Sequence, residues 1–231
     1  MLALPVAFTS CEDVLGHWEK PTPATPAPEG SIENPYKIAS SADWEAIAAK
    51  VNAGDGNIHI KQTADLSGIT TVIGTEENPF KGTYDGQGYA ISDINITGEN
   101  NLGLFGYVSS PDAVIENVVV TSGTVSGTGR SYGGIVGWLF AAGSDPFTLK
   151  NCHNGGNLVN TSGSDNSNNI IWGSKNMTGT SAVDPSNTYL SSMTFTLGGS
   201  PATLSEKAHG ATSVTSNPAG ITVGSKTYTK E

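Results

Sequence analysis

The first periodic pattern along the chain is helical. Between residues 41 and 54, apolar side chains recur at intervals of three and four positions, which places them on one helix face. They are Trp44, Ile47, Ala48 and Val51. Ser41 can cap the first turn, and Gly54 supplies a left-handed stop. One amphipathic helix ahead of strands predicts a cap over the apolar end and open edge of a β-structure.

Beyond this helix, short apolar segments recur and are separated by glycine, asparagine, aspartate and serine. Residues 91–96 correspond to residues 115–120 and, more weakly, to residues 149–152. If the segments are strands of successive coils, equivalent side chains lie directly above one another. The equivalent core positions are Ile94, Val118 and Cys152, and the equivalent corner positions are Asp93, Asn117 and Asn151. Cys152 is then a small buried thiol.

A second block repeats in the same part of the chain. Gly-Leu-Phe-Gly at 103–106 returns as Gly-Ile-Val-Gly at 134–137 and, degraded, as Ile-Ile-Trp-Gly at 170–173. Short strands at recurrent spacing, with insertions confined to turns, are typical of a solenoid. We therefore expect an all-β fold in which residues 58–175 form a short parallel β-helix behind an N-terminal capping segment at 34–57.

The pattern changes after Gly173. Apolar residues at 193, 195 and 197 alternate with threonine, which is typical of half-buried strands rather than a further repeat. Residues 176–231 are therefore predicted to form a small Ser/Thr-rich β cap or an appended sheet.

The composition agrees with a β-rich fold. The 231 residues include 29 glycines, and isoleucine plus valine outnumber leucine by 30 to 12, which favours strands over helical bundles. The chain has eleven basic and 21 acidic residues, and Arg130 is its one arginine. Binding to a phosphate backbone needs a basic surface, so nucleic acid is not an expected partner.

The N-terminus has the pattern of an export signal. A short apolar run at 2–8 is followed by two small residues, Cys11 and two acids. This order resembles a bacterial lipobox, which implies that residues 1–11 are the end of a lipoprotein signal peptide and that Cys11 is lipidated. Residues 12–33 contain clustered prolines and are predicted to be a tether. The expected location is the outer membrane of a Bacteroides-like bacterium, anchored by lipid and exposed at the cell surface.

The turn around Asp85 and Gly86, together with the glycine blocks, resembles the GLUG-motif proteins over residues 33–160. This resemblance implies a right-handed parallel β-helix of the kind found in adhesin-like surface proteins. GLUG repeats also accompany immunoglobulin-cleaving metallopeptidases. The residues assigned to the structural motif are Phe80, Gly82, Asp85, Gly86, Gly88, Gly103, Gly106, Asn117, Gly134, Gly137 and Asn151.

Catalysis on such a scaffold would be polysaccharide cleavage by a lyase or a hydrolase, by analogy of fold alone. A hydrolase needs two carboxyl groups about 5 to 10 Å apart, and the available carboxylates are Asp85, Asp93 and Glu116. Arg130 lies in a glycine-rich turn without a second cation at an equivalent position. Turn or corner roles explain Asp85 and Asp93 sufficiently. We therefore expect no catalytic residues.

The histidines do not form a recognisable metal motif. His17, His59, His153 and His209 are scattered along the chain and none lies in an H-E-x-x-H sequence. The peptidase activity of some GLUG proteins therefore does not transfer to this sequence. No metal and no cofactor are expected.

Aromatic residues supply the candidate binding surface. Tyr107 and Trp138 follow equivalent glycine blocks, so stacked coils would bring them into one column, with Tyr132 and Trp172 near them and Arg130 beside. An exposed column could bind a sugar face or a partner protein, whereas an inward column is core. The sequence thus predicts non-catalytic adhesion or recognition of a host glycan, a polysaccharide or a surface protein. The alternatives are a polysaccharide-active enzyme or its accessory subunit, and a structural spacer.

Overall fold

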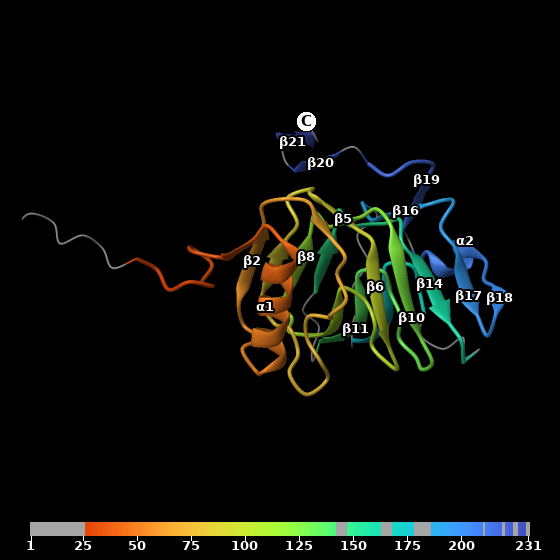
Figure 1. The fold of residues 1–231 in the computed structure, drawn as a ribbon, viewed down its shortest axis with the longest axis horizontal. Helices are drawn as coiled ribbons and strands as arrows, with labels where there is room; N and C mark the ends of the chain where they lie inside the picture. Colours follow the sequence, from red (N-terminus) through yellow and green to blue (C-terminus); the bar gives the residue numbers. More distant parts are fainter. Residues whose placement is uncertain are drawn as a thin grey trace, which may run out of the picture.

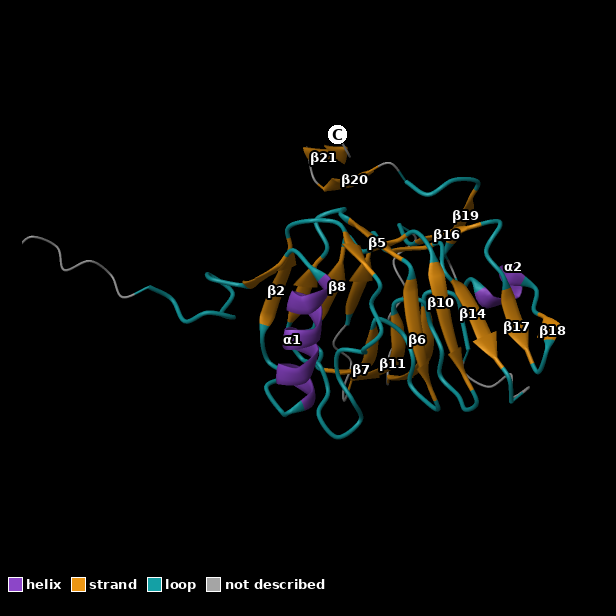
Figure 2. Cartoon of the chain, in the orientation of Figure 1, coloured by secondary structure: helices purple, strands orange, loops and turns teal. Residues whose placement is uncertain are grey.

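The structure is a computed structural model and is mostly β, with several separate sheets (Figures 1 and 2). It describes residues 26–141, 147–162, 168–177, 186–209, 211–218, 220–223 and 226–229. Four sheets are mainly parallel, and we number them I to IV in the order in which the chain reaches them. Helices α1 (Ser41–Asn52) and α2 (Leu204–Lys207) and an antiparallel hairpin complete the fold.

The strand bounds follow the four sheets. Sheet I contains β1 (Tyr36–Ile38), β2 (His59–Gln62), β4 (Thr83–Asp85), β8 (Val114–Glu116) and β12 (Thr148–Lys150). Sheet II contains β3 (Leu66–Ser67), β5 (Ala90–Ser92), β9 (Val119–Val120), β13 (His153–Asn154), β16 (Thr188–Leu190) and β19 (Thr212–Val214). Sheet III contains β6 (Ile94–Gly98), β10 (Gly123–Gly127), β14 (Asn157–Asn160), β17 (Phe195–Leu197) and the antiparallel β18 (Ser200–Pro201). Sheet IV contains β7 (Phe105–Ser109), β11 (Val136–Ala141) and β15 (Trp172–Met177), and the hairpin is β20 (Gly220–Val223) with β21 (Lys226–Thr229).

The chain visits the sheets in a fixed order. Strands β4 to β7 lie in sheets I, II, III and IV in turn, and β8 to β11 and β12 to β15 repeat this order. Each pass therefore adds one strand to every sheet. Neighbouring strands pair in parallel, so a residue of one pass lies beside its counterpart in the next.

Short strands alternate between buried and partly exposed side chains, and the buried set forms one apolar core. At the N-terminal end the core contains an aromatic cluster. The ring centroid of Phe105 lies 5.9 Å from Trp44, 5.2 Å from Phe80 and 5.1 Å from Tyr84. Because Trp44 belongs to α1, the helix contributes its buried face directly to this cluster.

Helix α1 confirms the predicted helix with one shift. Its N-cap is Ser40 rather than Ser41, and the Ser40 hydroxyl accepts a hydrogen bond from the backbone N–H of Asp43 at 3.2 Å. The four predicted apolar positions are all buried. Gly54, with φ +116°, follows the helix in the left-handed region, as predicted. The indole N–H of Trp44 donates to the carbonyl of Thr71 at 2.8 Å, which fixes the helix against the following loop.

The predicted fold class is wrong. We expected a short right-handed parallel β-helix with a separate C-terminal β cap, but the strands divide among several sheets, four of them mainly parallel, with two helices. The predicted alignment of repeats fails for its first segment, residues 91–96, because Ile94 pairs with Gly123 in sheet III. Val118 and Cys152, in contrast, immediately precede β9 and β13, which are neighbours in sheet II, so the predicted correspondence of these two residues is confirmed. The sequence alignment had joined strands of different sheets that share one apolar-polar pattern.

The C-terminal region does not form a separate cap either. Strands β16, β17 and β19 extend sheets II and III in parallel, and β18 adds an antiparallel edge. Within the described residues, the hairpin of β20 and β21 pairs with no other strand. The alternation at residues 193–197 thus belongs to a further strand of an existing sheet.

We expect Phe105→Ala to lower the free energy of unfolding by about 3–5 kcal/mol, because it empties the centre of the aromatic cluster. Urea denaturation followed by circular dichroism measures this change. Ile32→Ala is the control, since Ile32 is 67% exposed and its truncation leaves no cavity. A loss below about 1 kcal/mol for Phe105→Ala would contradict this account of the core.

Candidate functional site

Tyr107 and Trp138 form the aromatic pair of sheet IV. They are direct partners in the pairing of β7 with β11, and their rings stack with a centroid distance of 6.2 Å and an interplanar angle of 13°. Both side chains are partly exposed. The predicted adjacency of these two residues is therefore confirmed. The geometry is that of an offset-stacked pair, which aromatic rings prefer.

The surroundings of the pair differ at its two ends. On the β15 side, Trp138 pairs with Ser174, whose side chain is much smaller than a ring. On the other side, burial and the nearby Glu76 carboxylate raise the pKa of the Tyr107 hydroxyl. The Nε1 of Trp138 is shielded from solvent and has no hydrogen-bond partner among the residues that the structure describes. A shielded N–H without an acceptor costs free energy, and because it is buried it offers no donor to a ligand at the surface.

The other predicted binding residues do not join this pair at the surface. Tyr132 is fully buried, and its hydroxyl donates to the carbonyl of Glu99 at 2.5 Å and accepts from the backbone N–H of Gly129. Trp172 is buried as well, with its ring 5.3 Å from that of His209. Of the two possibilities left open by the sequence, these two rings therefore follow the inward one and belong to the core, not to a binding surface.

Arg130 is exposed in the turn between β10 and β11. Its backbone N–H donates to the side-chain carbonyl of Asn100 at 3.0 Å. Asp85 and Glu116, in contrast, are direct partners at the ends of β4 and β8 in sheet I. Arg130 and the two carboxylates thus belong to different sheets and turns, and the three groups form no common catalytic set.

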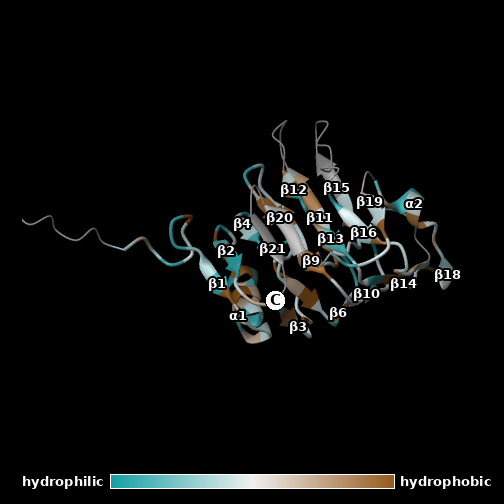
Figure 3. Ribbon diagram, turned by 90° about the horizontal axis from the view of Figure 1, so that it is seen from above, coloured by the Kyte–Doolittle hydropathy of each residue, from teal (hydrophilic) through white to brown (hydrophobic). Residues whose placement is uncertain are grey.

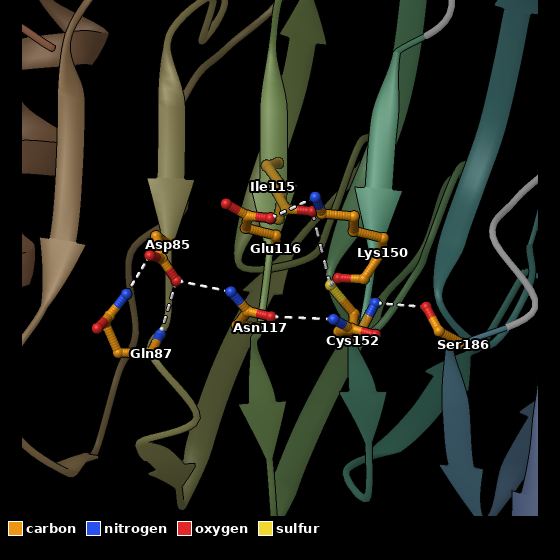
Figure 4. Close-up of polar contacts among 9 residues, drawn as sticks. Asp85, Gln87, Ile115, Glu116, Asn117, Lys150, Cys152 and Ser186 are labelled. Atoms are coloured by element: carbon orange, nitrogen blue, oxygen red, sulfur yellow. Dashed lines mark hydrogen bonds and ion pairs between the residues drawn. The ribbon is translucent and has the colours of Figure 1, made fainter. Parts of the chain in front are cut away.

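The two neighbouring carboxylates already have partners (Figure 4). Glu116 forms an ion pair with Lys150 at 2.8 Å, and Lys150 is its partner on β12. Asp85 accepts hydrogen bonds from the backbone N–H of Gln87 at 3.0 Å and from the side-chain amides of Gln87 and Asn117. Lys150 was not singled out from the sequence, although the alignment of residues 115–120 with residues 149–152 places it opposite Glu116.

The side chains at one corner of the fold form a hydrogen-bonded chain, which Figure 4 also shows. Asn117 donates to Asp85 at 2.8 Å, Asn151 donates to Asn117 at 3.2 Å, and the backbone N–H of Asn151 donates to Ser186 at 2.8 Å. The predicted neighbourhood of Asn117 and Asn151 is confirmed. Asp93 is not part of this chain, since its carboxylate accepts from Ser67 and Ser122.

The remaining motif residues have structural positions. Phe80 is buried, and Gly88 has a φ of +76°. A Cβ on Gly82 would lie 1.7 Å from the carbonyl oxygen of Ile58, and one on Gly137 would lie 2.3 Å from the carbonyl carbon of Asn101. A side chain at either position would therefore push apart two backbone segments that lie in direct contact. Gly86, Gly103, Gly106 and Gly134 likewise face backbone or side-chain atoms closer than 3.0 Å to an added Cβ.

His153 attaches the C-terminal segment to sheet II. Its Nε2 lies 2.9 Å from the side-chain oxygen of Asn217, and its Nδ1 lies 2.9 Å from the hydroxyl of Thr188. Asn217 also donates to the carbonyl of Thr121 at 3.0 Å, which orients its amide. A Cβ on Gly155 would lie 2.4 Å from the Asn217 oxygen, so only glycine leaves room for this contact.

The described part of the chain shows neither a cluster of metal ligands nor a helix suited to span a membrane. There, no three His, Cys, Asp or Glu residues gather in a way that could hold a metal ion. Of the helices in the described ranges, none has the length and apolar character needed to cross a membrane. Cys11, the predicted lipidation site, and His17 lie outside the described residues.

Comparisons with known proteins give one distant relative. No family model matches the chain, and no solved structure matches it. Halomucin from Haloquadratum walsbyi is 30% identical over 161 residues, which cover 62% of this chain and 2% of Halomucin. The chain thus corresponds to about 2% of that protein's length, and the similarity gives no specific function.

We expect stability to fall as the pH drops through the titration range of His153. Burial lowers the pKa of this imidazole from its ordinary value of 6.5, so the unfolded chain binds the proton more readily than the folded chain. The contribution of neutral His153 is therefore complete above about pH 7 and is lost progressively below pH 6.5.

Urea denaturation at intervals between pH 5 and pH 8 measures this dependence. The variant His153→Gln, which keeps a polar side chain but cannot titrate, should flatten the curve in that range. An equally steep curve for this variant would assign the pH dependence to other groups.

Proposed function

We propose that this chain is a non-catalytic recognition module that adheres to a glycan or a protein at a bacterial cell surface. The observation that carries the proposal is the stacked pair of Tyr107 and Trp138, which is partly exposed on paired strands. Rings held on a sheet lose little conformational freedom on binding, so their contact area converts efficiently into affinity.

The pair also has chemistry that suits a carbohydrate or a partner ring. A pyranose has an apolar face for stacking and hydroxyl groups that accept hydrogen bonds. Ser174, the neighbour of Trp138 on β15, carries no ring, so the stack of rings ends at the indole. A ligand that stacked on the exposed part of the indole would extend this row of rings.

The carboxylates favour binding over turnover. A glycosidase needs one carboxyl group that donates a proton and another that acts as nucleophile or base. Glu116 is engaged by Lys150, and Asp85 accepts hydrogen bonds from Gln87 and Asn117. These contacts give both carboxylates a structural role in sheet I.

Display at the outer membrane depends on the lipobox around Cys11. Lipidation there would leave the prolines of residues 12–33 as a spacer between membrane and folded part. This proposal rests on the sequence alone.

The full chain should bind glycans or surface proteins on an array of host glycans, bacterial polysaccharides and surface proteins. We expect Trp138→Ala to weaken binding by about 30-fold, which corresponds to about 2 kcal/mol for an anchoring aromatic residue. Trp138→Phe keeps a ring but reduces its contact area, so it should give an intermediate loss.

Tyr89→Ala is the matched control, since Tyr89 is an aromatic residue 37% exposed outside the pair. It should bind like the parent protein. An array without any bound ligand, or equal binding by Trp138→Ala, would contradict the proposal. Release of sugar fragments from a bound polysaccharide would contradict its non-catalytic part.

Lipidation is tested in a bacterial host that expresses the complete gene. We expect labelling by an alkyne analogue of palmitate in the parent and none in Cys11→Ala, because acylation needs the thiol of that residue. Cys152→Ala controls for loss of the other cysteine, which is buried. Absence of label from the parent would refute the anchor while leaving the binding module untouched.

A further inference from the structure

The outer face of sheet III carries no charged side chain. The residues of β6, β10, β14 and β17 include none, although the whole chain has a net charge of −10. Within these strands, buried apolar residues alternate with partly or fully exposed small residues. Most of the exposed residues are threonine, serine and asparagine, so this face is polar but neutral.

Strand pairing arranges these side chains in two rows. The first row contains Asn95, Thr124 and Asn157, and the second contains Thr97, Ser126, Val159 and Thr196. Positions along a row are separated by the strand spacing of about 4.8 Å, and the rows by two residues, about 6.6 Å. The result is a regular grid of short side chains. We call it the neutral face.

Much of the hydrogen-bonding capacity of the neutral face is free. Within the described residues, the side chains of Asn95, Thr97, Thr124 and Ser126 make no hydrogen bond. The side chain of Asn157 does, since its oxygen accepts from the backbone and hydroxyl of Thr194 at 2.8 and 2.9 Å. Hydroxyl groups both donate and accept, and so does the amide of asparagine. The neutral face can therefore both donate hydrogen bonds to a ligand and accept them from it.

The charged residues that belong to strands lie mainly on another side of the molecule. On sheet I, strand pairing aligns one row of five charged residues. This row contains Lys37, Lys61, Asp85, Glu116 and Lys150. Figure 3 shows β2, β4 and β12 along one side and β6, β10 and β14 along the other. Among the strands of the four sheets, charged residues are thus concentrated on sheet I, and Asp93, Glu99 and Arg130 lie in turns at the rim of the neutral face.

We propose that the neutral face binds an uncharged, hydroxyl-rich polysaccharide chain. An apolar partner would bury the free hydroxyl and amide groups without hydrogen bonds, and a charged partner would find no counter-charge. A neutral glycan avoids both penalties and matches the donors and acceptors of the grid. The stiff, β-branched threonines lose little entropy when they bind. This site lies on sheet III and is separate from the aromatic pair on sheet IV.

Retention of the full chain on polysaccharide resins tests this site. The neutral probes are microcrystalline cellulose, cross-linked dextran, insoluble mannan and agarose, and the acidic probe is a polygalacturonate gel. We expect retention on at least one neutral probe and none on the acidic gel. Ser126→Glu, which places a charge in the second row, should weaken retention at least tenfold.

Thr148→Glu is the matched control, since it adds the same charge to a partly exposed position on sheet I. It should be retained like the parent. Thr97→Val with Thr124→Val removes two hydroxyl groups without changing side-chain shape and should weaken retention even if Ser126→Glu folds poorly. Far-UV circular dichroism checks the fold of each variant.

Trp138→Ala distinguishes this site from the aromatic pair. Retention on the neutral probe should survive that substitution if the neutral face is responsible. The proposal is overturned if no neutral probe retains the parent, if the acidic gel alone retains it, or if Ser126→Glu and the double valine variant bind like the parent. Loss of retention in Trp138→Ala alone would transfer the binding to sheet IV.

Discussion

Parallel pairing between strands of successive passes is the constraint on which the whole structure depends. It satisfies the backbone of strands that are only two to six residues long, which could not be stable alone. It also places each side chain beside its counterpart one pass away. Like residues thereby form rows, and a row can be apolar, charged, neutral or aromatic. The stacked pair of Tyr107 and Trp138 and the ion pair of Glu116 and Lys150 are both products of this alignment.

Local patterns in the sequence predicted local structure well. The helix at 41–52, the left-handed Gly54 and the β-rich composition depend on neighbours within a few residues. Tyr107 and Trp138 were matched correctly because each follows a glycine block in which two apolar residues separate the glycines, and that block is specific to sheet IV. The apolar stretches containing Ile94 and Val118 are less specific. Strands of different sheets share this pattern, so the alignment that matched them gave the wrong register and the wrong fold class.

The candidate site was less predictable because burial and long-range contacts decide it. Tyr132 and Trp172 are of the same residue types as Tyr107 and Trp138, yet the structure buries both of them. The partners of Glu116 and His153 lie 34 and 64 residues further along the chain. The first distance equals the repeat offset between residues 115 and 149, whereas no repeat marks the second. The neutral face became visible only when pairing showed that uncharged residues of three separate segments share one row.

The order in which the chain visits the four sheets also bears on how such a protein evolves. Since each pass contributes one strand to every sheet, duplication of a single pass would lengthen all rows by one position and leave their chemistry unchanged. The contact area available to an elongated ligand would then grow in steps through gene duplication, without any redesign of an existing strand.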